Sequence, residues 1–158
     1  MNGISPENQI ELEKRFRIAA LIGLAQVAMT IVLAVIAWFV VSRTEIVETN
    51  ESVTALWVAV LFIAIGSILL RRLFFGWERL KDAALLGGIP GVLKKLQTNS
   101  LMLGMFAEAI AVIGFVIAMF TGSSFDMFRA AAIALIVFFI TFPRKRVWKT
   151  VVANLQET

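Results

Sequence analysis

Residues 105–120 read MFAEAIAVIGFVIAMF, a nearly unbroken apolar run that contains one carboxylate, Glu108. Apolar runs of this kind are typical of helices that cross a lipid bilayer, where a lone charged side chain costs at least ~2.5 kcal/mol on insertion scales. The run therefore predicts a membrane helix. It also raises the question of the acid: either the carboxyl has a function, or it lies close enough to the membrane edge to escape the cost.

The composition of the whole chain agrees with this prediction. Hydrophobic residues make up 59% of its 158 residues, whereas a soluble globular domain is about 45–50% apolar. No polar stretch is long enough to form a separate soluble domain. The sequence therefore predicts an all-α, polytopic membrane protein with a single transmembrane domain, surrounded by the lipid bilayer.

The chain contains no Cys, no His and no Tyr. It therefore cannot form disulfides, and it lacks the residues that hold iron–sulfur clusters, His-ligated haem and the common zinc sites. It also has no phosphate-binding glycine loop and no acidic metal cluster within an apolar run. We therefore expect neither an enzyme nor a bound cofactor, although chemistry by Ser, Asp, Glu or Lys remains open.

Four apolar runs are long enough to cross a bilayer, which requires about 20 residues for ~30 Å of hydrocarbon. Their order predicts four transmembrane helices arranged as two hairpins. Between the second and third runs, one helical face would carry Leu73, Phe74, Trp77, Leu80 and Ala84. That pattern predicts a cytoplasmic amphipathic helix along the inner leaflet, or a continuation of the second span into the cytoplasm. The predicted spans are residues 18–41, 53–70, 101–121 and 125–142.

The segment GGIPG at residues 87–91 is expected to break the amphipathic helix. Pro90 lacks a backbone donor, and glycine permits a sharp turn. The third span then needs a new helix start, for which Thr98, Asn99 and Ser100 are the possible N-cap residues.

The basic residues are distributed unevenly along the chain. All but two of the 15 Lys and Arg residues fall in the N-terminal segment, in the connection between the second and third spans, or in the tail after Pro143, the proline that ends the fourth span. Positive charge favours the cytoplasmic side, so both termini are predicted to be cytoplasmic in a multi-pass protein of the plasma (cell inner) membrane. The opposite side would carry Arg43 and Arg129, with Glu45, Glu48, Glu51 and Asp126.

Basic clusters at the cytoplasmic ends of the spans predict contacts with anionic lipid headgroups. A protein partner for the tail is the alternative. Nucleic acid is not expected as a partner, because the tail cluster is small and lies at a membrane face. The candidate headgroup-binding residues are Arg71, Arg72, Arg144, Lys145 and Arg146.

Glu108 and Gln26 are the candidates for an ion-binding site within the membrane. Glu108 lies about seven residues, or ~11 Å at ~1.5 Å per residue, from the cytoplasmic end of its span. One interpretation is a proton or cation site. The other is a structural carboxyl that is protonated, hydrogen-bonded between helices or bent toward a headgroup. Gln26 lies at a comparable depth in the first span, where an amide usually bonds to a neighbouring helix.

A weak internal repeat aligns AQVAMTIVLAVIAWF (25–39) with AEAIAVIGFVIAMF (107–120), which places Gln26 opposite Glu108. The two side chains could therefore touch. Small residues spaced three and four apart beside Glu108 predict close helix packing, and a carboxyl that faces protein rather than lipid. These residues are Ala107, Ala111, Gly114 and Ala118, with Ala130 and Ala134 on the fourth span.

The segment EAIAVIGFVIAMF resembles the ion-carrying outer helix of rotary ATP synthase c subunits, in which a glycine follows a carboxylate at a spacing of six. Glu108 and Gly114 match this spacing. The resemblance covers residues 105–120 and implies that Glu108 carries a proton or sodium ion. The layout of four short spans is also similar to ATP synthase subunit I, a small protein linked to c-ring assembly.

Two functional hypotheses follow. The first is a non-catalytic accessory or scaffold subunit of a membrane complex, which suits four spans with little soluble mass. The alternative is a proton- or cation-handling membrane protein that uses Glu108 as its intramembrane carboxylate, with the link to ATP synthase that the resemblance implies. Under both hypotheses we expect a homo-oligomer or a subunit of a larger complex.

Overall fold

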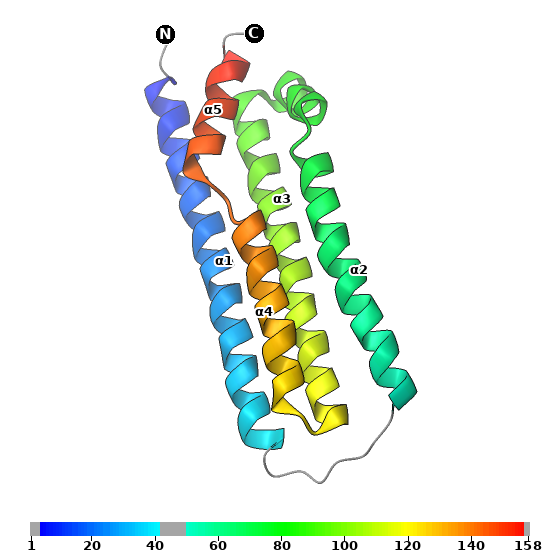
Figure 1. Cartoon of the computed structure of the whole chain (residues 1–158). Helices are drawn as coiled ribbons and strands as arrows, with labels where there is room; N and C mark the ends of the chain where they lie inside the picture. The colour runs from blue at the N-terminus through cyan, green and yellow to red at the C-terminus, as the bar shows by residue number, and fades with distance from the viewer. Residues whose placement is uncertain (1–3, 42–49, 157–158) are drawn as a thin grey trace.

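The computed structural model describes residues 4–41 and 50–156, and every regular element within these ranges is an α-helix (Figure 1). The all-α prediction is therefore confirmed. Helices α1 to α4 are long and apolar enough to cross a membrane. Arg43, Glu45 and Glu48 lie outside the described residues. The helices are α1 (Pro6–Val41), α2 (Asn50–Phe74), α3 (Trp77–Thr121), α4 (Ser124–Thr141) and α5 (Lys145–Gln156).

The four long helices form an elongated bundle with α3 and α4 between α1 and α2 (Figure 1). Helices α1 and α3 run in one direction, and α2 and α4 run in the other. Both α1 and α2 pack against α3 and α4, but within the described ranges they do not contact each other. The first two predicted spans therefore do not pack as a hairpin, because the central pair separates them.

The central pair, α3 and α4, is held by small side chains. Gly114 lies so close to α4 that a Cβ at this position would collide with the Cβ of Ala130. The predicted stripe on α3 is buried along its whole length, as are Ala130 and Ala134. Between helices in lipid, such close backbone approach supplies packing energy that the hydrophobic effect does not.

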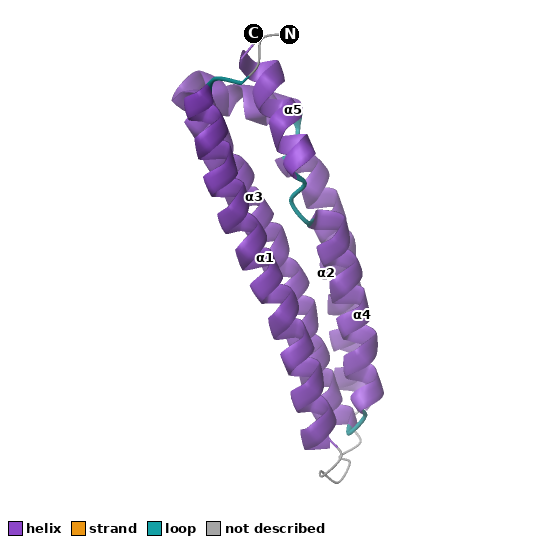
Figure 2. Ribbon diagram, turned by 90° about the vertical axis from the view of Figure 1, so that its left-hand side faces the viewer, coloured by secondary structure: helices purple, strands orange, loops and turns teal. Residues whose placement is uncertain are grey.

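A break at Gly88 divides α3 into two segments. Gly88 has φ 59° and ψ −162°, a backbone conformation that residues with a Cβ rarely adopt. Pro90 follows at the start of the second segment, where the missing N–H costs nothing. The segment before the break lies across the end of the bundle, and the segment after it runs along the bundle (Figure 2). The predicted break is therefore confirmed.

The expected helix start at residues 98–100 is wrong, because the second segment of α3 already begins just after Gly88. Asn99 has a different role: its Nδ2 donates a hydrogen bond of 2.8 Å to the carbonyl oxygen of Phe74 at the end of α2. Ser100 Oγ donates to Leu96 O within its own helix. The expected N-cap region instead joins α3 to α2.

The predicted amphipathic helix begins at Trp77, after α2 has ended, so it is not a continuation of the second span. Leu80 on its predicted apolar face is buried, and Ala84 is partly buried against the same cluster. These two residues therefore pack against protein, whereas Trp77 on the predicted face is 38% exposed. The other two residues of that predicted face, Leu73 and Phe74, belong to α2. Leu85 and Leu86 point outward instead, with exposed fractions of 85% and 91%.

Helix α5 folds the basic tail back onto α1 and α3. Its Trp148 is buried and meets Phe16 of α1 edge to face, with ring centroids 5.7 Å apart. Together with residues of α3 on both sides of Gly88, these residues form a second hydrophobic core at this end of the bundle. Its buried members are Leu12, Ala19, Leu80, Val92, Leu93, Leu96, Trp148 and Val152.

The contact of α3 with α4 gives a test of the packing. The substitution Gly114→Ala would force a methyl group against Ala130. It is expected to lower the free energy of unfolding by ~1–3 kcal/mol, the usual cost of overpacking. Gly66→Ala in α2 is the matched control, since a Cβ there meets no atom within 4 Å. Unfolding of each purified variant in detergent would measure its free energy of unfolding. Equal stability of the two variants would contradict the close α3–α4 contact.

Candidate functional site

The first residues of α1, the connection between α2 and α3, and helix α5 lie at the same end of the bundle (Figure 1, Figure 2). We call this the basic end, because it gathers the basic segments identified in the sequence. At the opposite end, the described basic residue Arg129 lies 3.6 Å from Asp126 and over the ring of Phe125. The charge asymmetry of the sequence is therefore also an asymmetry of the folded bundle. The basic end carries Lys14, Arg15, Arg17, Arg71, Arg72, Arg79, Lys81, Lys94, Lys95, Arg144, Lys145, Arg146 and Lys149.

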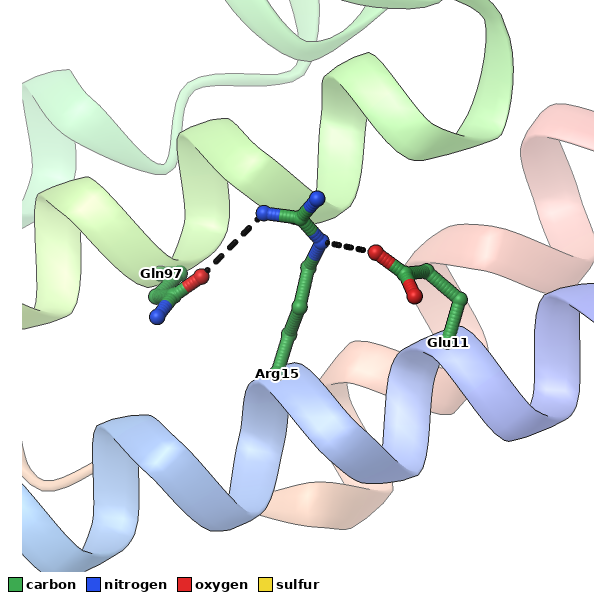
Figure 3. Close-up of polar contacts among 3 residues, drawn as sticks. All are labelled: Glu11, Arg15 and Gln97. Atoms are coloured by element: carbon green, nitrogen blue, oxygen red, sulfur yellow. Dashed lines mark hydrogen bonds and ion pairs between the residues drawn. The ribbon is translucent and has the colours of Figure 1, made fainter.

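Several of these charges have protein partners. Arg15 Nε donates to Glu11 Oε1 at 2.6 Å, and Arg15 Nη1 donates to Gln97 Oε1 at 3.3 Å, which ties α1 to α3 (Figure 3). Lys145 Nζ donates to Glu13 Oε1 at 2.7 Å and ties α5 to α1. This hydrogen bond and the charge of Lys145 lower the pKa of Glu13. The attraction is therefore present at neutral pH and is lost as the pH falls through that lowered pKa.

Three arginines that have no such partner among the described residues line one cleft of about 430 Å³. Arg71 and Arg72 belong to the last turn of α2, and Arg144 immediately precedes α5. No residue with a carboxylate is among the described residues that line the cleft. We call it the arginine cleft. Its lining consists of Ile68, Arg71, Arg72, Phe75, Thr141, Phe142, Pro143, Arg144, Val147 and Trp148.

Two local features bring the arginines together. The hydrogen bond from Asn99 to Phe74 O fixes the end of α2 against α3. On the other side of the cleft, α4 ends at Thr141, and the carbonyl oxygen of Arg144 accepts hydrogen bonds from the N–H groups of Val147 and Trp148 to start α5. The arginine cleft therefore lies between one helix C-terminus and one helix N-terminus.

Trp148 lines the arginine cleft and is 1% exposed. Its Nε1 is buried without a hydrogen-bond partner in the described structure. A buried donor that lacks an acceptor costs ~1–3 kcal/mol, so most such groups in proteins are paired. The nitrogen is closed to solvent and is therefore, among the described residues, an unpaired donor within the second hydrophobic core.

A second, apolar cavity of about 540 Å³ lies between α4 and α1, whereas the arginine cleft lies on the α2 side of α4 (Figure 1). Phe142 and Arg144 line both cavities. The remaining lining residues of the second cavity are Val27, Leu135, Phe138 and Phe139.

Of the five predicted headgroup-binding residues, the structure therefore brings Arg71, Arg72 and Arg144 together. Lys145 is bound to Glu13 instead, and Arg146 does not line the cleft. The sequence analysis missed helix α5 and the burial of Trp148. The recurrence of apolar residues at Val147, Trp148, Val151, Val152 and Leu155 has helical spacing and would have predicted both.

Gln26 lies within the bundle, where its amide covers Gly104 of α3 so closely that a Cβ at Gly104 would collide with it. Ser100 and Thr141 line the same small void as Gln26. Glu108 follows Gly104 by one helical turn and therefore lies near the α1 side of α3. The structure does not join Gln26 and Glu108, since the amide packs one turn nearer the basic end.

Glu108 is half-buried. Within residues 4–41 and 50–156, no hydrogen bond or ion pair is recorded for its carboxyl group. No group of three or more acidic residues in the same ranges could hold a metal ion. Glu108 is therefore an acid within an apolar helix that the described chain leaves without a polar partner.

No protein-family model, curated protein or solved structure matches this chain. Functional inference therefore depends on the geometry of its own residues.

The bond from Asn99 to Phe74 O predicts a specific defect. Asn99→Ala removes a partly buried hydrogen bond between two helices, and should lower the free energy of unfolding by ~1 kcal/mol and loosen the end of α2. The neighbouring variant Ser100→Ala removes only a bond within α3 and should cost less. Unfolding in detergent measures the free energy of unfolding of both variants. A Ser100→Ala defect as large as that of Asn99→Ala would show that Asn99 does not anchor α2.

Proposed function

We propose that this chain is a small multi-pass protein of the plasma membrane, with α1 to α4 crossing the bilayer and the basic end in the cytoplasm. Its role is that of a non-catalytic accessory or scaffold subunit of a larger membrane complex. The observation that carries the proposal is the half-buried carboxyl of Glu108, which has no polar partner within the described chain. The four long apolar helices and the charge asymmetry support the placement in the membrane.

A carboxyl group at this depth requires compensation. Its predicted distance from the cytoplasmic end of the span is ~11 Å, which exceeds the reach of a glutamate side chain. Polar groups within the membrane are stabilised by partners on neighbouring helices. Because the described helices of this chain supply none for Glu108, we infer that a donor from another polypeptide does so.

The surface around Glu108 is suited to such a contact. Met105 and Val112 lie one turn before and after it on the same face of α3, and they are 64% and 46% exposed. The partner helix would therefore lie against this side of α3, beside α1. The partner is either a second copy of this chain or a different subunit, and in both cases it contributes a hydrogen-bond donor at the level of Glu108.

Substitution of Glu108 tests the scaffold proposal. Glu108→Gln keeps a hydrogen-bonding side chain of the same length, so the complex should survive in native electrophoresis from a mild detergent. Glu108→Ala removes the group and should release this chain from the complex. A photoreactive residue at Val112 should crosslink to protein, whereas one at Phe139, 76% exposed on α4, should label lipid. A wild-type chain that migrates as a lone monomer would contradict the proposal.

Ion handling is the second candidate function. It is favoured by the combination of a half-buried carboxyl at Glu108 with the Glu108–Gly114 spacing that resembles the c-subunit helix. Here the carboxyl itself would bind and release a proton or sodium ion.

Flux measurements separate the two candidates. An ion carrier predicts proton or sodium flux in liposomes that contain the wild-type protein, and loss of that flux in Glu108→Gln, which cannot exchange a proton. A scaffold predicts no flux from either protein, together with the intact complex in Glu108→Gln. Equal flux from wild type and Glu108→Gln would remove the carrier hypothesis.

A further inference from the structure

We propose that the arginine cleft is a single phosphate-binding site, and that its occupant is the headgroup phosphate of an anionic phospholipid. This goes beyond a general attraction of the basic end to lipid, because it assigns three of the clustered basic residues to one site and leaves the others out. It is also independent of Glu108 and of the proposed scaffold role.

The charges at the cleft favour an anion. Arg71, Arg72 and Arg144 line it, and no residue with a carboxylate is among its described lining residues. Like charges that lie close together repel one another, and a bound anion relieves that repulsion. Guanidinium groups donate paired hydrogen bonds in a geometry that matches phosphate oxygens. Phosphate is therefore the chemistry that these side chains suit best.

The backbone at the cleft favours the same ligand. Helix α5 comprises 12 residues and begins at Lys145, next to the cleft. The first N–H groups of a helix lack partners within it, and the helix dipole makes this end positive. Helix N-termini bind phosphate groups for these reasons.

The position of the cleft identifies the source of the phosphate. It lies at the ends of α2 and α4, two helices that are long and apolar enough to cross a membrane. With the bundle placed in the bilayer as proposed above, lipid headgroups lie at this level. The lipid assignment therefore rests on the proposed membrane placement, whereas the phosphate chemistry does not.

The proposal can be tested by native mass spectrometry of the full-length protein titrated with phosphatidylglycerol in detergent. The test variant carries Arg71→Gln, Arg72→Gln and Arg144→Gln. The control variant carries Arg79→Gln, Arg146→Gln and Lys149→Gln, which remove the same charge from the same end but from residues outside the cleft lining. Circular dichroism and gel filtration verify that both variants fold.

The wild-type protein should retain one phosphatidylglycerol molecule in preference to phosphatidylcholine. The test variant should bind it about tenfold or more weakly, because charge-assisted bonds to phosphate are lost, while the control variant stays within about threefold of wild type. Replacing the three cleft arginines by lysine should give an intermediate affinity, because lysine keeps the charge without the paired donors. An equal loss of phosphatidylglycerol affinity in the test and control variants would overturn the proposed site, because nonspecific attraction to positive charge would then explain the binding.

Inorganic phosphate distinguishes the source. If the occupant is a phospholipid, millimolar phosphate should leave the bound phosphatidylglycerol in place. If phosphate displaces it and binds with the same dependence on the cleft arginines, the lipid assignment is overturned in favour of a soluble phosphate ligand.

Discussion

The close contact between Gly114 of α3 and Ala130 of α4 is the constraint on which the rest of the structure depends. Apolar helices in lipid gain little from the hydrophobic effect when they associate, so the closeness of their backbones decides which pairs form. Here the small residues of α3 and α4 allow these two helices to become the central pair. Helices α1 and α2 then occupy opposite sides of that pair.

This arrangement determines where polar groups can lie. Gln26 of α1 packs over Gly104 of α3, and Glu108 follows one turn further along the same side. The placement of α2 against α3 and α4 brings Arg71 and Arg72 beside the joint between α4 and α5. The position of Glu108 therefore follows from the packing of α1 against α3. The arginine cleft follows from the packing of α2 against α3 and α4.

The basic end follows different physics from the rest of the bundle. Its buried residues, with Trp148 and Leu80 among them, form a hydrophobic core of their own. Such a core is stabilised by the removal of apolar surface from water. This second core holds α5 against α1 and α3, and so it fixes Arg144. Some of the charged side chains at the basic end are paired with other residues, as Lys145 is with Glu13, and three of its arginines line the arginine cleft.

Much of the fold could be predicted from the sequence because its signals are local. Run length indicates the helices, Gly88 and Pro90 indicate the break, and the spacing of Ala107, Ala111 and Gly114 indicates a closely packed face. The separation of α1 from α2 could not be predicted in the same way, since helices that are apolar all round do not reveal which face meets a neighbour. The hydrogen bond of Asn99 to Phe74, and the grouping of Arg144 with Arg71 and Arg72 at one cleft, also escaped prediction, because each depends on residues far apart in the chain.

The central claim is the proposal that the bundle crosses the membrane, with the basic end and the opposite end on different sides. Cysteine labelling tests it most directly. The chain contains no cysteine, so Glu7→Cys near the start of α1 and Ser124→Cys at the start of α4 each provide a single reactive thiol. An impermeant maleimide added to intact cells should label Ser124→Cys, and should label Glu7→Cys only after the membrane is permeabilised. Labelling of both thiols from the same side of the intact membrane would contradict the account.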